Sequence, residues 1–367
     1  MTSLRLHPVA WVSWLLAILI GVTTTRNPLY LGLILLWLAA VMVTARLVLG
    51  QHFTRPPLSP WRWGSVMILS AALFNALNVH VGTHSLLHLP AWLPLFGGPI
   101  TLEALLYGAL NGLVLLALLL AFGVVNGVLP VWALVGLIPR AYYPVAVVVA
   151  IAVTFAPVTV RRLQQIQEAQ AIRGHQVRGL RCWLPLLLPL LTGGLEHAFQ
   201  LAEAMMARGF ASQAAVVYTL PTQVMVLLGL VGVLGGLLVQ MLTVRTLLSM
   251  GLLVGGSAVL IAALWGAGRS QPHTRYRPAP WRGRDWLVLC GALLVIVCFL
   301  LPVPGVDRVS LFYYPYPTLT LPAFAIPLGL ATWGLLMPVL ALLLDGLPKP
   351  PAPRPNERPT EMVEARR

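Results

Sequence analysis

Stretches of apolar residues, each about long enough to cross a bilayer, recur along this chain and constrain its fold more than any other feature. A helix needs roughly 20 mostly apolar residues to span the hydrocarbon core of a membrane. Nine stretches of the sequence have this character: 9–25, 29–49, 64–79, 100–126, 141–160, 214–243, 246–267, 286–303 and 323–345. Because lipid offers the backbone no hydrogen-bonding partner, such stretches fold as helices. The sequence therefore predicts an all-α fold, a polytopic helical membrane protein in contact with the lipid bilayer.

The composition agrees with a membrane protein and argues against a nucleic-acid partner. Hydrophobic residues make up 58% of the 367 residues and charged residues only 9%, whereas soluble domains carry about 25% charged residues. The net charge of +14 comes from 24 basic and 10 acidic residues. In membrane proteins such an excess is typical of cytoplasmic loops that face anionic lipid. No stretch interleaves basic and aromatic residues as a base-stacking surface does, so we expect no nucleic-acid partner.

Two Arg-rich segments interrupt the apolar pattern and set the expected orientation. Residues 161–213 keep helical periodicity, whereas residues 268–284 form a predicted loop. Because basic residues concentrate on the cytoplasmic side, we place both segments and the C-terminal tail in the cytoplasm of a multi-pass inner (plasma) membrane protein. The loop that contains Ser310 then lies outside, within reach of a label. One question stays open: 141–160 cannot cross completely and still deliver 161–213 to the cytoplasm unless an earlier stretch does not span.

Two amphipathic helices within the first of these segments end in a similar way. The first ends in "AQAIRG" (169–174) and the second in "AEAMMARGF" (202–210). Apolar side chains recur at helical spacing on one face of each helix: Val160, Leu163, Ile166, Ala169 and Ile172 in the first, and Leu195, Ala198, Phe199, Ala202 and Met205 in the second. Each ends in Arg-Gly, and Gly174 and Gly209 suit the left-handed position after a helix. These are either ordinary capped interfacial helices, because a terminal Arg favours the helix dipole, or helices that dock a partner.

The order of several motifs resembles the transmembrane T component of energy-coupling factor (ECF) transporters, the family that includes EcfT and CbiQ. The motifs, in chain order, are "LHP" (6–8), "TRNPLYLGLILL" (25–36), "GGPITLEALLYGALNGL" (97–113), "FAP" (155–157), "IQEAQAIRG" (166–174) and "AEAMMARGF" (202–210). The resemblance covers roughly residues 6–245, and its most specific part is the pair of Arg-Gly helix ends. Ile172 departs from the family pattern, in which alanine is usual at that position.

The resemblance implies a non-catalytic coupling subunit of an ABC-type ECF importer for a vitamin or a transition metal. Its partners would be two ABC-type ATPase subunits and a membrane S component that binds the substrate, and it would need no cofactor. The implied docking residues for the ATPases are Ala171, Arg173, Gly174, Ala207, Arg208 and Gly209. The chain itself lacks the GxxxxGK[ST] loop that cradles phosphate, since its only lysine is Lys349, so ATP hydrolysis would belong to the partners.

The expected organisation follows from the apolar stretches and this resemblance together. The regions, in chain order, are N-terminal transmembrane helices (1–160), cytoplasmic coupling helices (161–213), a transmembrane helix that completes the T-component-like core (214–245), additional C-terminal transmembrane helices with the cytoplasmic loop 268–284 (246–345), and a disordered tail (346–367). The resemblance does not explain the region 246–345.

Two other classes of function stay open at this level. A membrane-embedded enzyme, such as a lipid-linked transferase, would need paired acids or a metal motif such as HExxH, and the ten acidic residues are scattered. A membrane anchor for a soluble complex, without any transport, would need only the basic region 161–213. Co-purification with two nucleotide-binding subunits separates the transporter from both alternatives.

A few polar and small residues are weaker candidates for a site. His80, His84 and His88 would share one face of a helix and could hold a metal, but we expect no carboxylate near them. Glu103 stands at a predicted helix start, where a carboxylate suits the dipole; a proton relay is the alternative. Pairs of glycines four residues apart predict close helix packing, at Gly108 and Gly112, Gly232 and Gly236, and Gly251 and Gly255.

Overall fold

The computed structural model of the protein forms two compact units, and each is described by itself. Unit 1 draws on residues 1–130 and 279–367, and unit 2 on residues 131–278. The structure describes the following residues: 6–50, 53, 60–88, 98–173, 183–210, 220–242, 247–269, 281–301, 307–316 and 318–346.

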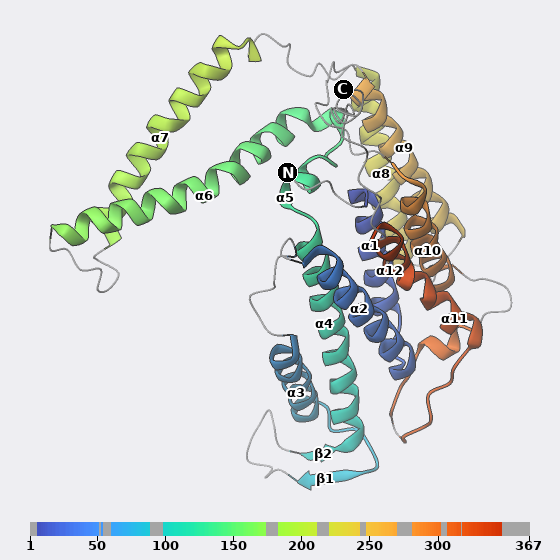
Figure 1. The fold of residues 1–367 in the computed structure, drawn as a ribbon. Helices are drawn as coiled ribbons and strands as arrows, with labels where there is room; N and C mark the ends of the chain where they lie inside the picture. Colours follow the sequence, from blue (N-terminus) through green and yellow to red (C-terminus); the bar gives the residue numbers. More distant parts are fainter. Residues whose placement is uncertain are drawn as a thin grey trace, which may run out of the picture. The chain divides into compact units, whose positions relative to one another are not determined.

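Unit 1 is a helical bundle with one short two-stranded ribbon (Figure 1). Its elements are α1 (Pro8–Thr24), α2 (Pro28–Leu49), α3 (Pro60–Asn78), β1 (Ser85–His88), β2 (Pro99–Thr101), α4 (Leu102–Val128), α10 (Gly283–Leu300), η5 (Val309–Leu311), α11 (Ile326–Ala331), η6 (Thr332–Leu336) and α12 (Met337–Gly346). The strands are antiparallel, with Leu87 opposite Ile100. Several helices begin where the sequence supplies a cap: Asn27 accepts a hydrogen bond from the Leu29 amide ahead of α2, which satisfies an otherwise unpaired donor.

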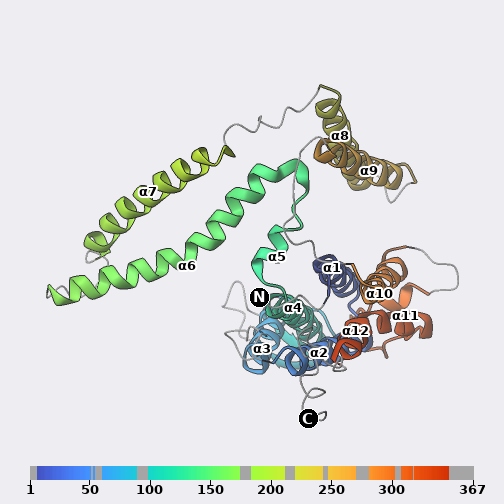
Figure 2. The same ribbon diagram turned by 45° about the horizontal axis from the view of Figure 1, so that its top comes forward.

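Helices that are far apart in the sequence pack together in unit 1. α1 lies against α4 and α10, and α2 lies against η6 and α12 (Figures 1 and 2). The fully buried Trp14 donates from its indole Nε1 to the carbonyl oxygen of Leu335 over 2.9 Å. Trp37 donates in the same way to the hydroxyl of Thr332 over 3.1 Å. The C-terminal helices α10–α12 therefore complete the bundle that the N-terminal helices begin.

The segment between α10 and α11 packs onto the turn between α1 and α2. The Asn27 side-chain amide donates to the carbonyls of Ser310 over 2.7 Å and Ala323 over 2.6 Å. The hydroxyl of Tyr30 lies 3.1 Å from that of Ser310. Ser310 is only 2% exposed, so the expectation that a label would reach it is wrong. The hydroxyl of Ser310 contacts Tyr30 of α2, and its carbonyl accepts a hydrogen bond from Asn27, the cap residue of α2.

The glycine pairs have different surroundings. A Cβ on Gly108 would lie 2.6 Å from the carbonyl oxygen of Ala71, and one on Gly112 would also meet the backbone of α3. The predicted close approach is therefore confirmed between α3 and α4. For Gly251 and Gly255 a Cβ would meet no described atom within 4 Å, so no close packing is found at this pair among the described residues.

Unit 2 contains two pairs of long helices. Its elements are α5 (Val131–Val135), η2 (Arg140–Tyr142), α6 (Tyr143–Ile172), α7 (Leu184–Ala207), α8 (Leu220–Leu242) and α9 (Leu247–Arg269). α6 packs on α7, and α8 packs on α9. α6 runs without interruption from the predicted apolar stretch 141–160 into the predicted amphipathic region, and it contains Pro157.

Among the described residues, seven helices are long and apolar enough to cross a membrane. They lie at Pro28–Leu49, Leu102–Val128, Arg140–Ile172, Leu220–Leu242, Leu248–Gly268, Gly283–Leu300 and Ile326–Leu344. Each corresponds to one of the nine predicted stretches, and the all-α polytopic membrane fold is confirmed. The other two predicted stretches are α1, a shorter apolar helix of 17 residues, and α3, which is not among the seven because its sequence is more polar.

Candidate functional site

The helices α6 and α7 end with nearly the same backbone geometry. Arg173 follows α6 with φ −80° and ψ 6°, and its amide donates to the carbonyl of Gln170 over 3.1 Å. Arg208 follows α7 with φ −87° and ψ 7°, and its amide donates to the carbonyl of Met205 over 3.2 Å. The two arginines are therefore carried by equivalent terminal turns.

The residue after the second arginine adopts the conformation that the sequence predicted. Gly209 has φ 77° and its amide donates to the carbonyl of Met206 over 2.9 Å. A side chain at this left-handed position would be strained, so glycine is the residue that lets the chain turn away at once. Gly174, the corresponding residue of the first helix, lies outside the described residues.

Both helix ends are open to their surroundings. Ala171, Arg173, Ala207 and Arg208 are all exposed. Within the described part of the chain, neither guanidinium makes a hydrogen bond or an ion pair. Each guanidinium thus keeps five N–H donors in a planar fork, which suits a carboxylate of another protein. The C-terminal ends of α6 and α7 point to different sides of the pair (Figures 1 and 2).

The two helices cross near the middle of α7. The guanidinium of Arg162 on α6 donates to the backbone carbonyl of Gly193 on α7. Beside this contact, the ring of Phe155 on α6 stacks on the ring of His197 on α7, with the ring centroids 5.3 Å apart. Arg162 is not part of the apolar face predicted for this helix, and sequence reasoning did not single out His197. The sequence signal that it passed over is Gly193-Gly194 in mid-helix, where the missing side chains leave a carbonyl accessible.

The predicted apolar face of α7 does not face α6. Leu195 and Phe199 on this face are 60% and 67% exposed. The residues of α7 that turn towards α6 are Gly193 and His197, on the other side of the helix. The apolar face of α7 therefore stays uncovered within the described residues.

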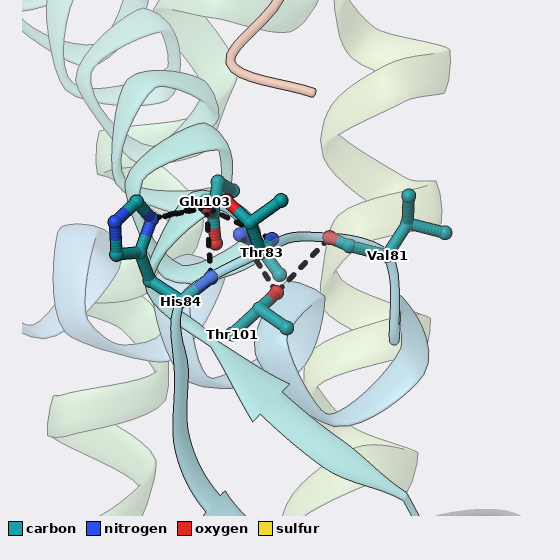
Figure 3. A network of polar contacts seen from close by, with 6 residues as sticks. Val81, Thr83, His84, Thr101 and Glu103 are labelled. Atoms are coloured by element: carbon teal, nitrogen blue, oxygen red, sulfur yellow. Dashed lines mark hydrogen bonds and ion pairs between the residues drawn. The ribbon is translucent and has the colours of Figure 1, made fainter. Parts of the chain in front are cut away.

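A second polar cluster joins the segment after α3 to the start of α4 (Figure 3). Glu103 is fully buried, and its Oε1 accepts from the amides of Thr83 and His84, each over 3.1 Å. The same oxygen accepts from the Thr83 hydroxyl over 3.0 Å and lies 2.8 Å from His84 Nδ1. The hydroxyl of Thr101, which caps α4, donates to the carbonyl of Val81 over 3.0 Å. These contacts hold residues 81–84 onto the α4 N-terminus.

This cluster corrects two expectations about the histidines. They do not share a helical face, because α3 ends at Asn78 and His88 belongs to β1. A carboxylate is also near, since Glu103 contacts His84. Where the chain is described, no group of three His, Cys, Asp or Glu side chains is placed to hold a metal. We call this cluster the Glu103 clasp, because its hydrogen bonds fix the loop 81–84 to the start of α4.

Comparison with known proteins covers the first part of the chain. A family model described as CbiQ, cobalt transport protein, matches residues 3–219. Among curated proteins, the energy-coupling factor transporter transmembrane protein EcfT of Leuconostoc gelidum subsp. gasicomitatum is 38% identical over 71 residues. That alignment spans 18% of this chain and only 26% of the relative's length. The family match includes α1 to α7 and ends directly before α8.

Proposed function

The chain belongs to the CbiQ family of transport proteins, and from this premise we propose that it is the coupling subunit of an ABC-type ECF importer. Two ATPase subunits would dock on the tips of α6 and α7, and a separate membrane S component would bind a vitamin or a transition-metal ion. The observation that carries the proposal is the pair of exposed arginines, Arg173 and Arg208, on terminal turns of matching geometry.

The physical argument rests on what a long arginine-tipped helix can transmit. Arginine pairs with a carboxylate through two parallel hydrogen bonds, a geometry that lysine cannot reproduce. α6 has 30 residues and α7 has 24, so they are about 45 Å and 36 Å long at 1.5 Å per residue. Motion of an ATPase pair at the tips would therefore reach the helix crossing and the membrane. Since the only lysine is Lys349, the chain has no GxxxxGK[ST] loop for ATP phosphates, and the energy would come from the ATPases.

The proposed orientation follows from the same assignment. Residues 161–213, as the coupling region, would lie in the cytoplasm together with residues 268–284 and the tail 346–367, and the protein would reside in the plasma membrane. The helix in 214–245 would complete the T-component core. The helices in 246–345 would be an addition to it.

The test is to remove the two docking groups and measure assembly. The chain with Arg173→Ala and Arg208→Ala is co-expressed with the ABC ATPase pair of its own genome, and the ATPases retained on the purified membrane subunit are quantified. Loss of one partner of a desolvated charged contact costs roughly 2–5 kcal/mol of binding, about 30-fold or more in affinity. We expect retention to fall at least that much. An arginine that only favours the helix dipole contributes about 0.3–1 kcal/mol, and to folding.

The matched control is Arg161→Ala, which removes an exposed arginine from the interior of α6 and should leave ATPase retention unchanged. Equal expression and elution of all variants shows that the membrane fold is intact. If the double variant retains both ATPases as the parent does, these arginines do not dock them and the proposed function loses its support.

A further inference from the structure

The helix pair α8–α9 is packed unusually closely. A Cβ on Gly236 would lie 2.9 Å from the backbone nitrogen of Leu253. A Cβ on Gly256 would lie 2.6 Å from the backbone nitrogen of Val233. Such small-residue contacts let two helix backbones approach directly in a membrane. The pair is therefore a tight hairpin, and it lies beyond the part of the chain that the family model matches.

The last turn of this hairpin contacts the short segment from which α6 starts. Gly268 of α9 is buried, and a Cβ there would lie 3.2 Å from Cβ of Arg140 and 3.4 Å from the backbone nitrogen of Ala141. Ala141 is fully buried. Both residues belong to η2, which leads directly into Tyr143, the first residue of α6. A Cβ at this position would need η2 to give way slightly, and a longer side chain would need η2 to move further.

The direction of α6 at its start determines where its far end lies. α6 has 30 residues and is about 45 Å long. A tilt of about 5° at the start displaces the other end by about 4 Å over that length. A shift of this size is more than a bidentate hydrogen bond tolerates, because such bonds need donor–acceptor distances of about 2.7–3.2 Å.

We propose that the last turn of α9 is a positioning clamp on the start of α6, in which Gly268 admits the η2 backbone and so fixes where the arginine tip of α6 lies. The role of that tip in docking rests on the proposed function, whereas the clamp is a property of this chain alone. A hairpin outside the family match would thus set the geometry of a helix inside it.

The clamp is tested by a distance between α9 and the far end of α6. In the full chain with Cys182, Cys290 and Cys298 replaced by serine, spin labels are placed at Ile172→Cys and Val254→Cys. Both positions are well exposed, at 88% and 70%. The distance between the labels is measured in lipid nanodiscs. We expect Gly268→Leu to shift or broaden this distance by about 4 Å or more, the displacement that a tilt of about 5° gives.

Gly266→Leu is the matched control. It places the same side chain two residues away on the same helix, where a Cβ meets no described atom within 4 Å, and it should leave the distance unchanged. If Gly268→Leu does not fold, Gly268→Ala is tested instead. Its smaller shift in the label distance should be reversed by Arg140→Gly, because that second change removes the opposing Cβ. Such reversal identifies a direct contact between the two positions.

A functional readout separates positioning from mere stability. In the assembled complex, ATP turnover should fall about fivefold or more with Gly268→Leu, the scale of a typical coupling between sites, and return with the Arg140→Gly rescue. If Gly268→Leu and Gly266→Leu give the same label distance, the proposed positioning of α6 by α9 is refuted, even when the arginine variants lose the ATPases. If the arginine variants keep the ATPases while the label distance shifts, the proposed function fails and the clamp stands.

Discussion

Gly334→Ala should strongly destabilise unit 1, because the added methyl group has no room. Gly334 of η6 faces Gly291 of α10, and a Cβ on Gly334 would lie 2.3 Å from the carbonyl oxygen of Gly291. Ordinary contacts to a Cβ lie at 3.4–4 Å. The two backbones would therefore have to separate by more than about 1 Å. Neither partner is the flexible end of a side chain, so the helices themselves must move.

The magnitude follows from the contacts that such a movement breaks. Overpacking of a well-packed interior costs about 1–3 kcal/mol. The buried bond from Trp14 to the carbonyl of Leu335, at 2.9 Å, would stretch beyond hydrogen-bonding distance and contribute about 1 kcal/mol more. Alanine regains about 0.5–1 kcal/mol relative to glycine through its lower conformational entropy in the unfolded chain. The net loss is about 1–3 kcal/mol, or several degrees in unfolding temperature.

The assay is thermal unfolding in detergent, followed by tryptophan fluorescence, because Trp14 is fully buried against η6. Gly255→Ala is the matched control: it adds the same methyl group to a helix at a position with no described atom within 4 Å. It should be neutral or slightly stabilising. If Gly334→Ala unfolds at the temperature of the parent or above it, the close approach of α10 and η6 does not hold and the reasoning is refuted.

Two further predictions concern orientation and the Glu103 clasp. A cysteine at position 270 should be unreactive to an impermeant label added to intact cells, whereas Leu321→Cys, at a position 95% exposed, should react; labelling at 270 without permeabilisation would reverse the proposed orientation. Glu103→Ala should abolish hydrogen-exchange protection of the Thr83 and His84 amides, because both donate to this carboxylate. The control His84→Ala should keep the Thr83 amide protected. Equal protection of the Thr83 amide in the two variants would show that the carboxylate does not hold the loop.

The parts of the fold that were predictable are those fixed by local sequence. Apolar length identified the seven helices that are long enough to span a membrane, since each carries its own signal of about 20 residues. The conformation of Gly209 followed from a single Arg-Gly pair at the end of a periodic stretch. Such features need no knowledge of distant residues.

The features that sequence reasoning missed depend on residues outside their own element, from 19 to 283 positions away. Helical periodicity reveals that α7 has an apolar face but not which neighbour covers it, and the face towards α6 is instead built on Gly193. The contact between His84 and Glu103 forms only because a ribbon folds the segment back onto α4. Ser310 sits in a segment that looks like an exposed loop, and its burial comes from α2, nearly 300 residues earlier.

The packing of α1 on the C-terminal helices also has a consequence for biosynthesis. The hydrogen bond from Trp14 to Leu335 joins residues 321 positions apart. At a synthesis rate of about 5–20 residues per second, the carbonyl acceptor reaches the membrane roughly 15–60 s after the tryptophan. During that interval the face of α1 that packs on α10 can contact only lipid, the helices synthesised between α1 and α10, or the insertion machinery. Nascent chains that stop short of α10 lack the partners of this face, so the bundle of unit 1 is completed only after the C-terminal helices have been inserted.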